Sequence, residues 1–162
     1  MALIVVSNTS PISNLAAIGQ LNLLQKLYDK VTIPPTVYQE IINSGTTDPG
    51  TLAIQTLDWI QVLPITDMTL LQTLQVKLDP GEAEAITLAV ELPADRLLID
   101  ERKGRNEAIK SGIRVTGVIG ILLAAKKQGF VTQIKPILND LINNGFWICE
   151  QLYTEVLLLA GE

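Results

Sequence analysis

Three acidic side chains within residues 78–105 stand where functional groups are often found in α/β proteins. Glu82 and Glu84 lie in the first turn of a predicted helix over residues 80–92. Asp100 directly follows residues 96–99, a short apolar run that predicts a buried strand. Ligands of open α/β sheets bind beyond the carboxyl ends of the strands, so Asp100 is a candidate site residue. The alternative is structural, because acids also favour and cap the N-termini of helices.

Two further polar residues follow predicted strands in the same way. Asn8 comes after the strand predicted over Ala2–Ser7, and Glu40 lies on the helix predicted over Thr36–Ile42, close to that helix's apolar face. Carboxyl ends of neighbouring parallel strands meet at one edge of a sheet, so we expect these side chains to converge with the three acids. A Glu40 that only faces solvent is the simpler alternative.

The chemistry expected of such a cluster is binding of a divalent cation. The sequence contains no histidine, which excludes Ser-His-Asp and Cys-His catalysis and His-ligated zinc sites. Oxygen ligands alone favour Mg²⁺ or Mn²⁺. Bound to three or four oxygens, these cations polarise a phosphodiester and activate water.

Charge is distributed unevenly along the chain. The net charge of −5 argues against a general nucleic-acid coating protein. Residues 101–135, however, carry eight basic and two acidic side chains directly after the candidate site. This segment could hold phosphates, or it could be an ordinary solvated helix face. The one cysteine, Cys149, and the absence of an apolar run of about 20 residues lead us to expect a cytoplasmic protein without a membrane span.

Short apolar runs alternate with helical patterns along the whole chain. This alternation predicts an α/β fold with a central, mainly parallel sheet flanked by helices, in one domain over residues 1–162. Besides the elements already given, we expect helices near 11–18, 21–28, 51–57, 69–76, 102–111, 117–128, 132–143 and 150–160, and strands near 31–33, 59–63, 113–116 and 146–148.

Four segments carry a resemblance to a known family, and they occur in the family's order with its spacing. The segments are VVSNTSPISNLAAIG, IPPTVYQEI, GEAEAITLA with LLIDERKGR, and RVTGVIGILLAAKKQGFV. Together they resemble PIN domains, and in particular a prokaryotic PIN-like branch often found beside antitoxin-like genes. The resemblance implies a three-layer α/β sandwich, with the C-terminal helices, about 132–162, as an extension specific to the branch.

The resemblance also assigns roles to residues. It implies that Asn8, Glu40, Glu82 and Asp100 occupy the family's four acidic positions, with Glu84 as the alternative third acid. Thr9 or Ser10 would match a supporting hydroxyl, and Ser10, Arg102 and Arg105 would contact substrate phosphates. The implied activity is a Mg²⁺- or Mn²⁺-dependent ribonuclease of toxin type. The implied partners are RNA, a small antitoxin protein and a second copy of the chain.

One residue departs from the family's pattern, since Asn8 stands where the family has Asp. An amide oxygen can still contact a metal but adds no negative charge. This leaves two interpretations, a weakened endoribonuclease and a catalytically degenerate PIN-like module that binds RNA or protein. A third interpretation, a flavodoxin-like phosphoryl-transfer domain, is disfavoured because the sequence contains no Gly-rich phosphate-binding loop.

Overall fold

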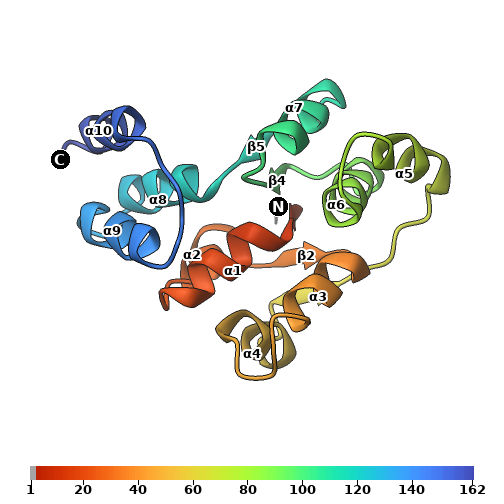
Figure 1. Cartoon of the computed structure of the whole chain (residues 1–162), viewed down its shortest axis with the longest axis horizontal. Coiled ribbons are helices and arrows are strands. Elements are labelled where there is room, and N and C mark those ends of the chain that lie inside the picture. The colour runs from red at the N-terminus through yellow and green to blue at the C-terminus, as the bar shows by residue number, and fades with distance from the viewer. Residues whose placement is uncertain (1–2) are drawn as a thin grey trace.

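The computed structural model describes residues 3–162, which form an α/β fold around a five-stranded sheet (Figure 1). Every strand pairs in parallel with its neighbours, in the order β3-β2-β1-β4-β5. The strands are β1 (Val5–Ser7), β2 (Val31–Ile33), β3 (Ile60–Val62), β4 (Arg96–Leu98) and β5 (Val115–Thr116). The strand β1 is therefore central, and β4, which precedes Asp100, is its direct neighbour.

The inner strands are buried because helices cover both faces of the sheet. Val5, Val6, Leu97 and Leu98 are at most 1% exposed, which explains why these strands read as continuous apolar runs rather than as alternating patterns. The edge strand β5 is only half-buried and is two residues long. A short edge strand limits unwanted pairing with other chains.

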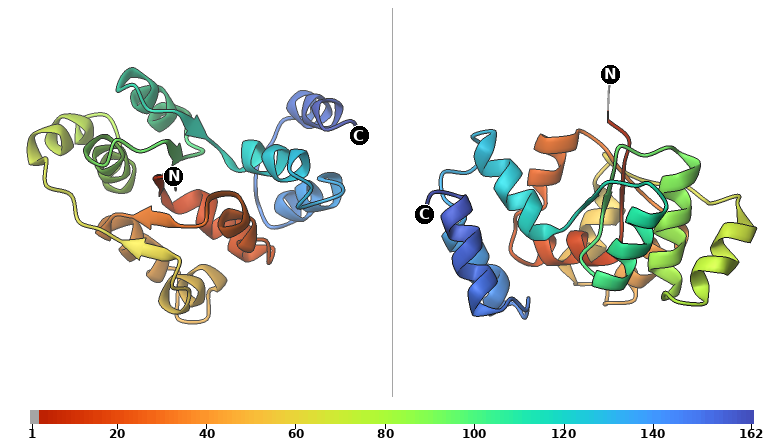
Figure 2. Two further views of the ribbon diagram at one scale, coloured as in Figure 1. Left: turned by 180° about the vertical axis from the view of Figure 1, so that it is seen from behind. Right: turned by 90° about the horizontal axis from the view of Figure 1, so that it is seen from above.

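Ten helices surround the sheet in residues 3–162, which gives three layers in all (Figure 2). Helix α6 packs against β1, β4 and α3, and α8 packs against β5, α2 and α10. Helices α8, α9 and α10 lie together at one end of the molecule. The helices are α1 (Thr9–Ala17), α2 (Asn22–Tyr28), α3 (Pro35–Ile42), α4 (Pro49–Thr56), α5 (Met68–Gln75), α6 (Pro80–Glu91), α7 (Arg102–Lys110), α8 (Val118–Lys127), α9 (Lys135–Asn143) and α10 (Glu150–Leu159).

The predicted fold class is confirmed, and one predicted strand is wrong. Residues 146–148 are not a strand and do not join the sheet. Gly145 turns the chain with a φ of +98°, and the Phe146 N–H donates to the Leu141 carbonyl at 2.9 Å, closing the end of α9. The apolar Phe146 and Ile148 pack against the core from this loop, which explains their strand-like pattern. The predicted start of the first strand at Ala2 lies outside the described residues.

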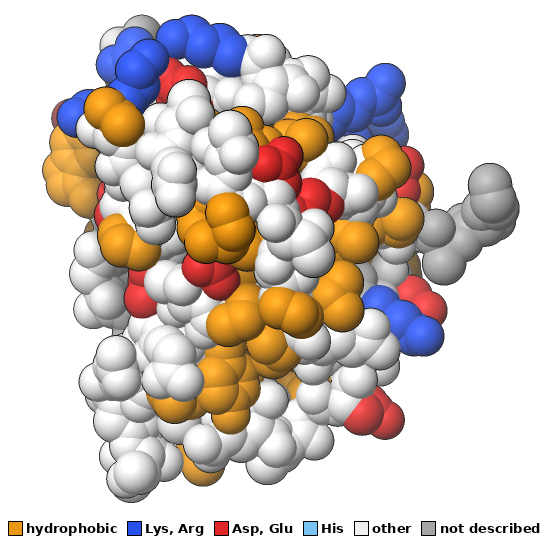
Figure 3. All heavy atoms as spheres, turned by 90° about the vertical axis from the view of Figure 1, so that its right-hand side faces the viewer, with side chains coloured by type: hydrophobic (Ala, Val, Ile, Leu, Met, Phe, Trp, Pro, Cys, Tyr) orange, Lys and Arg blue, Asp and Glu red, His pale blue; other side chains and the backbone are white. Residues whose placement is uncertain are grey.

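Charged and apolar side chains are distributed unevenly over the surface. On the face shown in Figure 3, Lys and Arg side chains gather mainly at the upper margin, while apolar side chains and a few acids occupy the middle. Exposed apolar residues of the segment from β3 to the residue that follows α5 are Val62, Leu63, Met68 and Val76. In residues 3–162, every helix falls short of the length and apolar character that crossing a bilayer requires.

Glu84 joins two helices that carry other candidate site residues. Its Oε1 accepts the backbone N–H of Thr36 at 3.0 Å, and its Oε2 accepts the Thr36 hydroxyl at 2.5 Å. Thr36 lies in the first turn of α3, where backbone N–H groups have no helical partner and a negative charge is stabilised. Glu84 therefore fixes the start of α3, which carries Glu40, against α6, which carries Glu82.

Replacing Glu84 tests this link. We expect Glu84→Ala to lower the free energy of unfolding by about 1–3 kcal/mol, because charge-assisted hydrogen bonds to the start of α3 are lost. Glu84→Gln, which still offers one oxygen acceptor, should lose less. Urea denaturation at neutral pH measures both variants, and an unchanged midpoint for Glu84→Ala would contradict the assignment.

Candidate metal and phosphodiester site

Asn8 connects β1 to α1 and carries an unsatisfied polar atom. Its backbone N–H donates to the Leu98 carbonyl at 2.8 Å, which fixes it beside the end of β4. The residue occupies the N-cap position of α1, yet its side chain makes no capping hydrogen bond. Asn8 is only 4% exposed, and its Oδ1 has no hydrogen-bond partner among the described residues. The Asn8 side chain thus does not cap α1, and its amide oxygen remains available to a ligand.

The next residue, Thr9, holds Glu40. The Thr9 hydroxyl donates to Glu40 Oε2 at 2.5 Å, across 31 residues of sequence. The same carboxylate lies against the backbone of α6, because a Cβ built on Gly81 would come within 2.1 Å of Glu40 Oε1. Glycine at position 81 therefore makes room for Glu40 beside the first turn of α6.

Ser10 holds Asp100 in the same manner. The Ser10 hydroxyl donates to Asp100 Oδ2 at 2.9 Å and accepts the Asn14 amide N–H at 3.0 Å. Asp100 Oδ1 accepts the backbone N–H of Val118 at 2.8 Å and so caps α8 rather than α7. Burial raises the pKa of Asp100 above its ordinary value, and the hydrogen bonds from Val118 and Ser10 oppose that rise.

Because Thr9 and Ser10 are consecutive, Glu40 and Asp100 lie on the same side of the molecule. These two carboxylates therefore meet at the start of α1, beyond the carboxyl end of β1, whereas the convergence of all the candidate residues stays a prediction.

Glu82 is the least satisfied of the acids. It is 6% exposed, and its Oε2 has no hydrogen-bond partner among the described residues. That oxygen lies against the backbone of α7, since a Cβ on Gly104 would meet it at 2.6 Å. Burial, followed by the nearby carboxylates of Asp79 and Glu101, raises the pKa of Glu82 to about 7. A buried carboxylate in acidic surroundings is stabilised by a cation.

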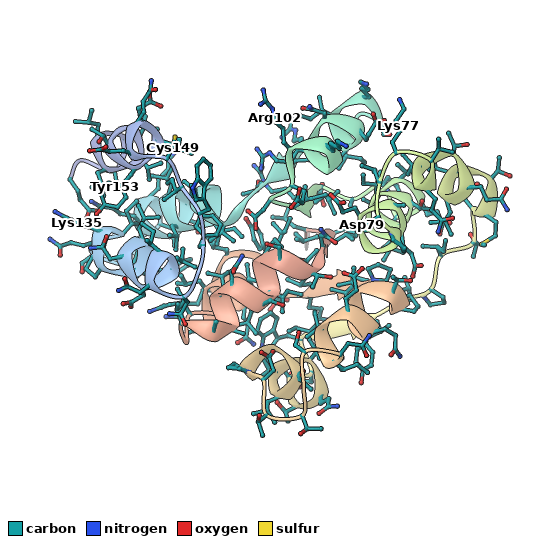
Figure 4. All side chains as sticks on the ribbon, in the orientation of Figure 1. Lys77, Asp79, Arg102, Lys135, Cys149 and Tyr153 are labelled. Carbon is teal, nitrogen blue, oxygen red and sulfur yellow. The ribbon has the colours of Figure 1, made fainter. Side chains whose placement is uncertain are left out.

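The two arginines predicted to bind substrate lie close to Asp100 in the chain, but only one of them has its side chain held by a hydrogen bond. Arg105 donates from Nη1 to the Ile99 carbonyl at 3.1 Å and is half-buried. Arg102 is exposed at the start of α7, where Figure 4 labels it. Both line a cleft of about 1130 Å³ that also includes Ser10 and Asp100. This position is compatible with phosphate contacts, although the substrate-binding role stays a prediction.

The available oxygen ligands suit a hard divalent cation, although the described residues do not enclose one. Asn8 Oδ1 and Glu82 Oε2 are buried oxygens without donors, and oxygen is the ligand that Mg²⁺ and Mn²⁺ prefer. Within residues 3–162, however, no three acidic side chains are grouped closely enough to surround one ion. Glu84 is engaged with Thr36, and Asp100 with Ser10 and Val118. The metal-binding roles of Glu40, Glu82, Glu84 and Asp100 thus stay predictions.

Several residues that shape the site were not identified from the sequence. Gly81 and Gly104 leave room for Glu40 and Glu82, and Asn14 supports Ser10. Gly104 lies within the helix over residues 102–110, where glycine is unfavourable unless close packing requires it. A glycine inside a predicted helix, such as Gly104, therefore indicates from the sequence that another group packs closely against that helix.

The raised pKa of Glu82 predicts a pH dependence of stability in EDTA. In the unfolded chain the carboxyl titrates near 4.5, and in the folded protein near 7. Its contribution to stability is therefore complete below about pH 4.5 and is lost as the pH rises to about 7. A shift of this size corresponds to roughly 3 kcal/mol.

The variant Glu82→Gln removes this titration. We expect it to be about as stable as the parent chain at pH 4.5 but more stable at pH 8. The difference between the two chains, from urea denaturation at each pH, cancels the titration of groups that do not interact with Glu82. Parallel pH profiles would show that Glu82 ionises normally.

Comparison with known proteins agrees with the geometry. A solved structure of a PilT N-terminus domain protein from the hyperthermophilic archaeon Sulfolobus solfataricus P2 is similar, with a TM-score of 0.52 and 19% sequence identity over 76% of this chain and 93% of that one. At this identity the likeness concerns the fold alone. A search of curated proteins found no match. Residues 4–162 match the family described as DUF3368, PIN domain, and the chain belongs to that family.

Proposed function

We propose that this protein is a PIN-domain endoribonuclease that hydrolyses phosphodiester bonds with Mg²⁺ or Mn²⁺, weakened by Asn8. The observation that carries the proposal is the buried, unpaired Oε2 of Glu82 on α6, a helix that packs against β1 and β4. Folding leaves this oxygen without a donor although an unsatisfied buried acceptor costs about 1–3 kcal/mol. Such a cost is tolerated at sites that bind a ligand.

Each residue of the site has a separate role in the proposal. Asn8, Glu40, Glu82 and Asp100 would hold the cation, and the hydroxyls of Thr9 and Ser10 fix the orientation of Glu40 and Asp100. When bound, the cation would polarise the phosphodiester and favour formation of a hydroxide nucleophile. The guanidinium group of Arg102 makes no ion pair within residues 3–162 and is exposed, so it is free to contact a neighbouring phosphate.

A degenerate binding module is the second candidate, and the observation that favours it is Asn8. The structure uses both oxygens of Asp100 and both oxygens of Glu84 for internal hydrogen bonds. The neutral amide of Asn8, where the family has Asp, leaves the site with one negative charge fewer, and the oxygens of Asp100 and Glu84 are already engaged. The chain would then retain the cleft and the arginines for binding RNA without cleaving it.

The family supplies the wider context of the proposal. RNA is the proposed substrate, and a small antitoxin protein is the proposed partner that would keep such a toxin inactive, with a homodimer as the proposed assembly. The exposed apolar side chains of β3 and α5 are of the kind that protein partners cover (Figure 3). The proposed location is the cytoplasm, where the single cysteine, Cys149, would stay reduced.

Restoring the acid at position 8 tests the proposed activity. We expect Asn8→Asp to bind Mn²⁺ and to cleave single-stranded RNA faster than the parent chain. The gain should be roughly tenfold or more, since a unit charge ~4 Å from a cation contributes ~4 kcal/mol per charge near a protein surface. Calorimetric Mn²⁺ titration and gel analysis of labelled RNA measure the two effects.

Two control variants separate the site from general charge effects. Adding Glu82→Gln to Asn8→Asp should abolish Mn²⁺ binding and cleavage. Asp58→Asn, which removes an exposed acid before β3 at the opposite edge of the sheet, should change neither. Mn²⁺ binding without cleavage in Asn8→Asp would favour the binding module. Failure of both chains to bind Mn²⁺ would reject the metal site.

A further inference from the structure

The cleft beside the acidic site has a second wall that the proposed reaction does not use. Its lining includes Ser10, Asp100, Arg102 and Arg105. It also includes Trp147, from the segment that leads into α10, and Leu152 of α10 itself. Figure 4 shows Arg102 on α7 and Cys149 at the start of α10, on the elements that flank this cleft. The cleft, about 1130 Å³, is larger than the roughly 300–1,000 Å³ of small-molecule sites. Its size suits several residues of a polymer.

The charges of the cleft suit a polyanion. Arg96, Arg102 and Arg105 line it, against the two carboxylates of Asp100 and Glu101. Arg96 donates to the Thr116 hydroxyl at 3.0 Å and Arg105 to the Ile99 carbonyl, so two of the guanidinium groups are already oriented. A phosphate chain that leaves the acidic site along β5 would pass these groups. Arginines held in a fixed orientation recognise phosphates well, so they could bind this chain.

Trp147 is held out of the core by the fold. It is 82% exposed, whereas the chain's other tryptophan, Trp59, is 7% exposed. The neighbouring Phe146 packs against the core and closes α9, so the loop is anchored on one side of Trp147. A large aromatic ring that is exposed yet lines a basic cleft is the arrangement on which unpaired bases stack.

The segment that carries Trp147 is also tied down on its other side. The Tyr153 hydroxyl donates to Asn139 Oδ1 at 2.7 Å, joining α10 to α9. Glu162 accepts the backbone N–H groups of Ile134 and Lys135 at 2.8 and 3.1 Å and pairs with Lys126 of α8 at 3.0 Å. Trp147 is therefore presented on a fixed support, which lowers the entropic cost of binding.

We propose that Trp147 and the arginine-lined cleft form a base-stacking subsite that holds an unpaired nucleobase of the RNA next to the bond to be cut. This inference rests on the proposed function for the identity of the polymer, and it adds a binding role for the C-terminal segment. The Trp147 ring stacks on the base, and Arg102 and Arg105 contact the flanking phosphates. Trp147 is a binding residue and takes no part in the chemical step.

Binding measurements in EDTA test the subsite without any cleavage. The probe is a labelled single-stranded RNA hexamer, and fluorescence anisotropy gives its affinity for the full chain. We expect Trp147→Ala to bind roughly 5- to 150-fold more weakly, the effect of removing one base–aromatic stack. Trp147→Phe should recover most of the loss. Leu158→Ala, which truncates an apolar side chain of α10 that is 72% exposed and is not among the cleft-lining residues, should leave the affinity unchanged.

A hexamer with abasic residues distinguishes stacking from other effects. The parent chain should bind the abasic hexamer as weakly as Trp147→Ala binds the intact one, and Trp147→Ala should not discriminate between the two. In a Trp59→Phe background, the intact hexamer alone should quench the emission of Trp147. If Trp147→Ala lost the same affinity for the intact hexamer as for the abasic one, the subsite would be overturned. The absence of any RNA binding by the parent chain would overturn it as well.

Three outcomes separate this inference from the proposed function and from a protein interface. Mn²⁺-dependent cleavage together with unchanged binding by Trp147→Ala would reject the subsite alone. Trp147-dependent binding without cleavage in Asn8→Asp would reject the nuclease and keep the subsite. If sedimentation shows that Trp147→Ala changes the parent chain from dimer to monomer while RNA affinity is unchanged, Trp147 belongs to a contact between copies of the chain.

Discussion

Two adjacent hydroxyl groups at the start of α1 hold the acidic site together. Thr9 donates to Glu40 and Ser10 to Asp100, so one short segment fixes carboxylates that are 60 positions apart in the sequence. The segment itself is placed by β1, the central strand, whose neighbours β2 and β4 lead to those acids. The whole site thus depends on the parallel order of three buried strands, and the helices determine where each carboxylate points.

The acids differ because each has a different set of donors. Asp100 and Glu84 bind helix N-termini, and Glu40 binds a hydroxyl, so each of these three has a hydrogen-bond donor within the protein. Glu82 has Gly104 and Ile99 against it and retains an oxygen without a donor. The structural interpretation therefore describes Glu84 and Asp100, whereas the functional interpretation of Glu82 stays a prediction. Glu82 is the residue at which a bound cation would relieve the largest electrostatic cost.

The fold and the approach of Glu40 and Asp100 to the end of β1 could be predicted from the sequence, whereas the partner of each acid could not. Apolar runs and helix-start signals such as Asp79-Pro80 are local patterns, and the alternation of strands with helices determines the sheet. In contrast, Glu84 binds Thr36 from 48 positions away, and Asp100 caps a helix 18 positions later. Tertiary packing sets these pairings. The loop at Phe146 has the apolar pattern of a strand, because such a pattern does not distinguish pairing in a sheet from packing after a helix end.

The close approach of Gly81 to Glu40 has a consequence for the variation of related sequences. A methyl group at position 81 would overlap the Glu40 carboxylate, whose nearest oxygen would lie 2.1 Å away. A shorter acid at position 40 would withdraw the carboxylate from α6 and leave space for that methyl group. Among homologues, alanine at position 81 should accordingly accompany aspartate rather than glutamate at position 40. Such a paired substitution would be the sequence signature of this contact.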